Sequence, residues 1–99
     1  MMEQEKKERG NRIIITVVGK DRVGIIAGVA TVLSENSINI LDISQTIMQE
    51  FLVMVMIADM EKSKVDLKEL KVILDRKGEE LGTRINAQHE DAFSYMHRL

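Results

Sequence analysis

The stretch VVGKDRVGIIAG, residues 17–28, carries the chain from an expected strand into an expected helix. The strand comprises residues 12–19 (RIIITVVG), which are apolar on both alternating faces, as in a strand at the centre of a sheet. The helix comprises residues 23–36, where apolar side chains recur every three or four positions. Between them lies a short charged turn, flanked by Gly19 and Gly24. This turn is either a ligand-binding loop or only a structural connection between the strand and the helix.

Two further strands follow the first helix. Residues 38–48 (INILDISQTIM) and 51–60 (FLVMVMIADM) are rich in β-branched and other apolar residues. They are separated only near Gln49 and Glu50, which predicts a short hairpin. The second strand of this hairpin is again apolar on both faces, so we expect it to be central in the sheet.

The last third of the chain predicts a helix, a strand and a short helix. The longer helix begins near Ser63 or Asp66, because either side chain can cap it and each has an acidic residue three positions on, and it ends at Gly82. Residues 83–89 (TRINAQH) form a weaker strand, suited to the edge of a sheet. Residues 90–99 form a short amphipathic helix.

The element order is therefore βαββαβ with a terminal helix, which is the split βαβ pattern of the ferredoxin-like fold. It predicts an α+β sandwich in which an antiparallel four-stranded sheet carries two helices on one face, with a short C-terminal helix added. The first and third strands are central in that topology, in agreement with their two apolar faces. Residues 1–11 have mixed charges and no apolar periodicity. We expect a flexible N-terminal tail there and a single domain over residues 12–99.

Composition excludes several kinds of function. The 99 residues include no cysteine, which excludes disulfides, thiolate metal sites and a cysteine nucleophile. A net charge of −2 and few aromatic residues do not suit nucleic-acid binding. No apolar run has membrane-spanning length or the form of a leader. We therefore expect a cytoplasmic protein with no cofactor and with neither a membrane nor a direct nucleic-acid partner.

Two surfaces of the expected fold predict a homodimer. One is the sheet face that the two longer helices leave open, because the third strand is apolar there and the terminal helix is too short to cover it alone. Leu52, Met54, Met56 and Met60 lie opposite Phe51, Val53, Val55 and Ile57 on this strand, so both of its faces are apolar. The other is the side of the first helix opposite its core stripe, where small residues would allow a second backbone or a ligand to come close. These small residues are Gly24, Ala27, Gly28 and Thr31. The alternatives are a monomer covered by its own terminal segments, and small residues merely tolerated on an exposed face.

The charged turn has several possible functions. Gly19 and Gly24 have the spacing of a nucleotide-binding P-loop, but Ile25 and Ile26 stand where lysine and a hydroxyl residue are required. More generally, a glycine-flanked turn at a helix start offers free N–H groups and the positive end of a helix dipole to an anion. Asp21 can cap the helix or bind an ammonium group. The structural alternative is that it only caps the helix.

Catalytic and metal sites have little support. The acylphosphatases, ferredoxin-like enzymes of similar size, hold an acyl phosphate in the same turn with an arginine placed inside the helix start, whereas Arg22 precedes Gly24 here. His89, Glu90 and Asp91 could bind a metal, but three adjacent residues do not easily converge on one ion. We expect a strand end and a helix cap there.

The segment VVGKDRVGIIAGVATVLSENSINILDISQTIM (residues 17–48) resembles the ACT domain, a βαββαβ regulatory module that senses amino acids and other small metabolites. The D-R-x-G-I turn and the N-I that follows the first helix carry this resemblance. Together with LDISQT and HEDAFSYMHRL, residues 12–99 resemble the small stand-alone prokaryotic ACT-domain proteins, which are related to the ACT repeats of the glycine-cleavage transcriptional repressor.

The resemblance implies a non-enzymatic regulatory protein that binds an amino acid or similar metabolite between two subunits and acts on a partner protein. Its turn would use backbone groups near the glycine, and an asparagine at the start of the second strand would come from the neighbouring subunit. The residues concerned are Asp21, Arg22, Val23, Gly24, Ile25 and, from the neighbour, Asn39. Asp42 and Gln45, polar residues in an apolar strand, are additions of our own. The alternatives are a ligand-free dimeric interaction module and an acylphosphatase-like hydrolase.

Overall fold

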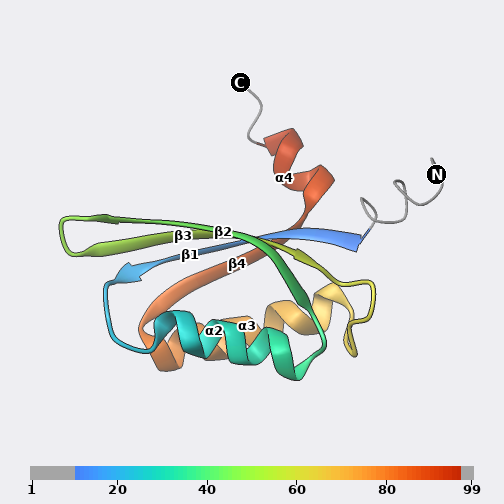
Figure 1. Ribbon diagram of the computed structural model, residues 1–99, viewed down its shortest axis with the longest axis horizontal. Helices are drawn as coiled ribbons and strands as arrows, with labels where there is room; N and C mark the ends of the chain where they lie inside the picture. The colour runs from blue at the N-terminus through green and yellow to red at the C-terminus, as the bar shows by residue number, and fades with distance from the viewer. Residues whose placement is uncertain (1–10, 97–99) are drawn as a thin grey trace.

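The computed structural model describes residues 11–96, which form a four-stranded antiparallel sheet with two helices packed on one face (Figure 1). The elements are β1 (Arg12–Lys20), α2 (Ile25–Glu35), β2 (Asn39–Met48), β3 (Phe51–Asp59), α3 (Leu67–Leu81), β4 (Thr83–His89) and α4 (Glu90–Met96). The strand order is β2-β3-β1-β4, so β1 and β3 are central. This arrangement confirms the predicted α+β, ferredoxin-like βαββαβ fold with its short C-terminal helix. Residues 1–10 of the predicted tail, and residues 97–99, lie outside the described residues.

The core lies between the sheet and the two longer helices. The register of β1 and β3 pairs Ile15 with Met56 and Val17 with Met54, and all four side chains are fully buried on the helix side of the sheet. The helices contribute buried side chains from Ile25, Val29, Val32, Leu33, Leu70 and Leu74. Because burial of one such side chain is worth about 1.5–3 kcal/mol, this layer dominates the stability of the fold.

The ends of α3 have the predicted signals. The Asp66 carboxylate caps the helix by accepting a hydrogen bond from the N–H of Glu69 at 2.8 Å. Ser63 instead bonds to the backbone of Val65, so of the two candidate caps only Asp66 acts as one. Gly82 ends the helix in the left-handed conformation, with φ 70°, which a residue without Cβ adopts at little cost.

The start of α2 differs from the prediction in two respects. The helix begins at Ile25, two residues after the predicted start, and its N-cap is Gly24 without any side-chain cap. Asp21 therefore does not cap the helix, so the structural alternative given for this residue does not hold. The N–H of Asp21 donates instead to the carbonyl of Glu50 at 2.9 Å, which ties the turn to the tip of the hairpin between β2 and β3.

The small residues of α2 do not form one uniform contact face. A Cβ added at Gly28 would lie 3.0 Å from Cδ1 of Leu81. The element that approaches Gly28 is therefore α3 of the same chain, not the ligand or second backbone that we expected there. Ala27 and Thr31 are exposed, and nothing lies within 4 Å of a Cβ built at Gly24. Of the small residues on α2, only Gly28 is therefore in contact with α3, and Gly24, Ala27 and Thr31 are exposed.

The face of the sheet opposite α2 and α3 is here called the outer face. α4 stands on this side, above the ends of β1 and β4 (Figure 1). It leaves much of β3 and its neighbours open, so Phe51 is 47% and Val18 45% exposed. No helix within residues 11–96 is both long enough and apolar enough to cross a membrane.

Candidate functional site

The turn between β1 and α2 presents backbone N–H groups that the fold does not use. The first hydrogen bond into the helix runs from the N–H of Gly28 to the carbonyl of Gly24, at 2.8 Å. Within the described part of the chain, the N–H groups of Ile25, Ile26 and Ala27 have no acceptor, as expected at an uncapped helix N-terminus. These groups and the helix dipole favour an anion such as a carboxylate.

A cavity of about 460 Å³ opens beside this turn. It is lined by Asp21, Arg22, Val23, Gly24, Ile26, Ala27, Gln45, Ile47 and Leu52. The turn and the start of α2 supply one wall, and the hairpin of β2 and β3 supplies the other. The size falls within the range of about 300–1,000 Å³ that is usual for small-molecule sites. The cavity therefore joins free backbone donors to an apolar wall.

Most of the residues predicted for the turn lie at this cavity. Asp21 and Gly24 are exposed at its rim, and Val23 is fully exposed. Ile25 does not line the cavity, because its side chain is buried in the core with 1% exposed. Ile25 can therefore contribute only its backbone N–H to the site. The resemblance also assigns backbone groups of the turn to the ligand.

Arg22 lines the cavity but uses its guanidinium elsewhere. Nη1 donates a hydrogen bond to the carbonyl of Leu81 at 3.2 Å, at the C-terminal end of α3. A cation there satisfies a free carbonyl and complements the negative end of the helix dipole. The structure therefore gives Arg22 a role in joining the turn to α3.

Asn39 and Asp42 lie away from the cavity of their own chain. Asn39 pairs with Asp59, which pairs with Arg12, so it lies at the end of the sheet opposite the turn. Asp42 pairs with Ile57 on the outer face, and its carboxylate accepts a hydrogen bond from the N–H of Ile43. Gln45 pairs with Met54 on the helix side and does line the cavity.

Three apolar residues of the cavity were not predicted from the sequence. They are Ile26, Ile47 and Leu52. Ile47 could have been found, because it lies two positions from Gln45 on the same strand and so points to the same face. Leu52 pairs with Ile47 across the hairpin. Predicting its place at the cavity requires the register of the two strands.

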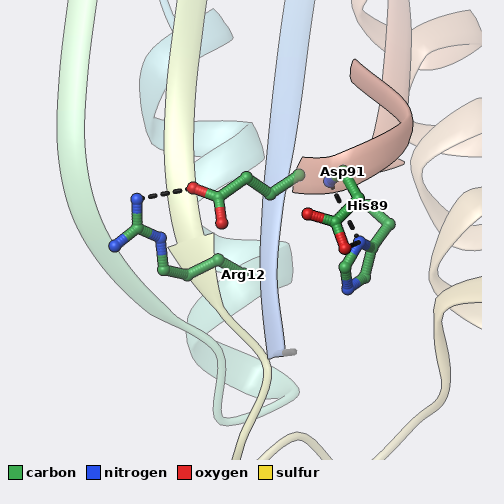
Figure 2. Close-up of polar contacts among 4 residues, drawn as sticks. Arg12, His89 and Asp91 are labelled. Atoms are coloured by element: carbon green, nitrogen blue, oxygen red, sulfur yellow. Dashed lines mark hydrogen bonds and ion pairs between the residues drawn. The ribbon is translucent and has the colours of Figure 1, made fainter. Parts of the chain in front are cut away.

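The polar residues at the base of α4 are engaged with one another (Figure 2). Nη2 of Arg12 lies 2.6 Å from Oε1 of Glu90. Nδ1 of His89 accepts a hydrogen bond from the N–H of Asp91 at 3.1 Å. The carboxylate of Glu90 is thus used by Arg12 on β1, and within residues 11–96 no group of three acidic or histidine side chains is arranged to hold a metal ion.

These features define the class of the molecule: a small α+β sandwich with an open cavity at the strand-to-helix turn. A family model described as the ACT domain matches residues 11–88, and the chain belongs to this family. The predicted family relationship is therefore confirmed.

Individual proteins agree with this assignment. A UPF0237 protein of Methanocaldococcus jannaschii is 52% identical over 89 residues, covering 90% of this chain and 99% of that protein. An ACT domain protein from Streptococcus pneumoniae superimposes with a TM-score of 0.76 at 38% identity, covering 89% of this chain and 99% of the other. The structure of a putative glycine cleavage system transcriptional repressor has a TM-score of 0.69 at 20% identity, with 79% of this chain and 44% of that chain covered, and shows the shared fold.

Proposed function

We propose that this protein is a non-enzymatic regulatory ACT-domain protein that binds an amino acid or similar small metabolite at the cavity beside Gly24. The observation that carries the proposal is the set of unused N–H groups at the start of α2, beside a cavity of about 460 Å³ that Gly24, Ile26 and Ala27 line. A carboxylate fits such donors because they are already oriented and need no reorganisation. The ligand would change the contacts of a homodimer with a partner protein.

Each part of an α-amino acid has a counterpart at the cavity. The carboxylate would accept from the N–H groups of Ile25 and Ile26, and the ammonium group would approach Asp21. The side chain would contact Ile47 and Leu52. Asn39 of a neighbouring subunit would supply a further polar contact, since this residue lies too far along the sheet to act within its own chain. Three or four hydrogen bonds at about 1 kcal/mol net each correspond to a Kd on the order of millimolar.

Titration of the protein with each of the twenty amino acids, followed by thermal shift and calorimetry, tests the proposal. We expect at least one to raise the Tm at millimolar concentration. Gly24→Asp should abolish this response, because a fixed carboxylate repels the ligand's own. Gly24→Asn is the matched neutral control and should keep most of the response, since asparagine tolerates the left-handed conformation. If no amino acid shifts the Tm, or if Gly24→Asp responds as the wild type does, the site is not a sensor of this kind.

The second candidate function is a ligand-free dimeric interaction module. The exposed apolar outer face, with Phe51 and Val18 nearly half exposed, favours it independently of the cavity. It predicts a dimer that responds to none of the twenty amino acids. Acylphosphatase-like turnover is the least favoured alternative, because the guanidinium of Arg22 is bound to the carbonyl of Leu81. Release of phosphate from an acyl phosphate that is lost in Arg22→Ala would revive it.

A further inference from the structure

The cavity beside Gly24 has apolar side chains on both of its walls. Those on the α2 wall are Ile26 and Ala27, and those on the hairpin wall are Ile47 and Leu52. Ile26 is 40% and Ile47 54% exposed, so both side chains leave apolar surface in contact with water. Contact with an apolar group of a ligand would remove this surface from water, which is favourable. The walls therefore suit an apolar ligand side chain better than a polar one.

The charged groups of the turn offer no counter-ion to a charged ligand side chain. Lys20 pairs with Phe51 and so points to the outer face, away from the cavity. The guanidinium of Arg22 is bonded to the carbonyl of Leu81. Within residues 11–96, Asp21 is the one acidic residue that lines the cavity, and the proposed function assigns it to the ammonium group of the ligand. Neither an acidic nor a basic side chain therefore finds an opposite charge that is left for it.

The two walls of the cavity are tied to each other. The N–H of Asp21 donates to the carbonyl of Glu50 at 2.9 Å, which joins the turn to the hairpin at the same end of the molecule (Figure 1). Within the hairpin wall, Ile47 and Leu52 are held in register as a cross-strand pair. A preformed cavity costs a ligand little reorganisation, so differences in contact between side chains appear as differences in affinity.

We propose that the ligand of this cavity is an α-amino acid with an apolar side chain larger than a methyl group, such as valine, leucine, isoleucine or methionine. Ile26 and Ile47, one from each wall, determine this selectivity. Gln45 also lines the hairpin wall, but its side chain is exposed, so its amide can remain hydrated beside an apolar ligand. The inference rests on the proposed function, because it assumes that the ligand carboxylate binds at the start of α2, and it names the class of ligand.

The expected selectivity is moderate. One methylene group more or less in an apolar pocket changes the discrimination between ligands by about tenfold to 200-fold. Because Ile26 and Ile47 keep roughly half of their surface in water, the ligand side chain would be covered only in part. We therefore expect differences in Kd near the lower end of this range.

Calorimetric titration with pairs of amino acids of equal shape tests the proposal. Valine and threonine form one such pair, and leucine and asparagine form the other, so that only the polarity of the side chain differs within each pair. We expect the Kd of the apolar member to be about tenfold lower than that of its polar counterpart, and the Kd of leucine to be about tenfold lower than that of alanine. Aspartate, which has the shape of leucine and an added charge, should bind more weakly than asparagine.

Matched variants locate the selectivity on the two walls. Ile47→Ala and Ile26→Ala should each bring the ratio of the alanine Kd to the leucine Kd from about ten toward one. Val72→Ala is the control, because Val72 is 51% exposed on α3 and does not line the cavity, and it should keep the ratio of the wild type. All three side chains are exposed, so the variants should fold, and circular dichroism establishes this.

The outcomes separate the class of ligand from the existence of the site. Tighter binding of threonine than valine, or of asparagine or aspartate than leucine, would overturn the inference, and so would a wild-type ratio in both isoleucine variants. If Gly24→Asp still abolishes binding in those cases, the sensor function stands with another class of ligand. If none of the twenty amino acids binds the wild type, the proposed function fails and the inference fails with it.

Discussion

Nη1 of Arg22 donates a hydrogen bond to the main-chain carbonyl of Leu81, at 3.2 Å, across 59 positions of sequence. The same guanidinium lies against Gly82, where an added Cβ would come within 2.7 Å of Nη1. The turn at the cavity is therefore held in place by the C-terminal end of α3. This contact makes the side chain of Arg22 part of the scaffold that positions the N–H groups of α2.

Replacing Arg22 with alanine should lower the free energy of unfolding by about 0.5–1.5 kcal/mol, because a carbonyl at the helix end loses its donor and the dipole loses its cation. Urea unfolding measures this change. Arg76→Ala, which removes an exposed arginine from α3, is the matched control and should have a smaller effect. Equal losses in the two variants would show that the contact with Leu81 is not stabilising.

Replacing Gly24 with alanine should cost about 1–2 kcal/mol of stability. Its φ of 96° lies in the left-handed region, and nothing lies within 4 Å of the added Cβ, so the cost is conformational and not steric. Gly24→Asn should cost less, because asparagine adopts this region more readily. Thermal and urea unfolding of the two variants give the comparison. A loss in Gly24→Asn as large as that in Gly24→Ala would contradict this explanation.

The sequence predicted the elements of this fold well because their signals are local. The two apolar faces of residues 12–19 and 51–60 identify central strands, and Asp66 and Gly82 delimit α3 through contacts within a few positions. The site was less predictable. Periodicity assigned Gly28 to an open face, but only the packing of α2 on α3 shows that it accommodates Leu81.

The same limit applies to the turn. Asp21 has the right residue type for a cap, but its N–H is held by the carbonyl of Glu50 on the hairpin, a contact between distant segments. The apolar wall of the cavity depends on the pairing of Ile47 with Leu52 in the same way. Local patterns therefore indicated where a site could form, and tertiary contacts decided which side chains reach it.

Replacing Glu90 with glutamine should release α4 from the sheet. Its carboxylate is 17% exposed and lies 2.6 Å from Arg12, which is the contact that ties the base of α4 to β1. We expect a loss of about 1 kcal/mol, since Arg12 remains a third exposed and water screens the pair in part. Hydrogen exchange over residues 90–96 should become faster.

The ion pair between Lys77 and Glu80 provides the control for this prediction. Its atoms are 3.4 Å apart and Glu80 is 65% exposed, so Glu80→Gln should change stability very little. If Glu90→Gln leaves hydrogen exchange in α4 unchanged, the position of this helix does not depend on Arg12.

Two glycines inside helices should respond to alanine with opposite signs. A Cβ at Gly28 would lie 3.0 Å from Cδ1 of Leu81, the far end of a flexible side chain that can move. A Cβ at Gly78 would lie 2.7 Å from the carbonyl oxygen of Thr83, a backbone atom held within β4. Alanine favours a helix over glycine by about 1 kcal/mol. Gly28→Ala should therefore be neutral or stabilising, whereas Gly78→Ala should lose about 1–3 kcal/mol through overpacking. Urea unfolding of both variants measures the two changes in the free energy of unfolding. If Gly28→Ala loses as much stability as Gly78→Ala, then Leu81 cannot adjust. The contact of α2 with α3 would in that case be as rigid as the contact of α3 with β4.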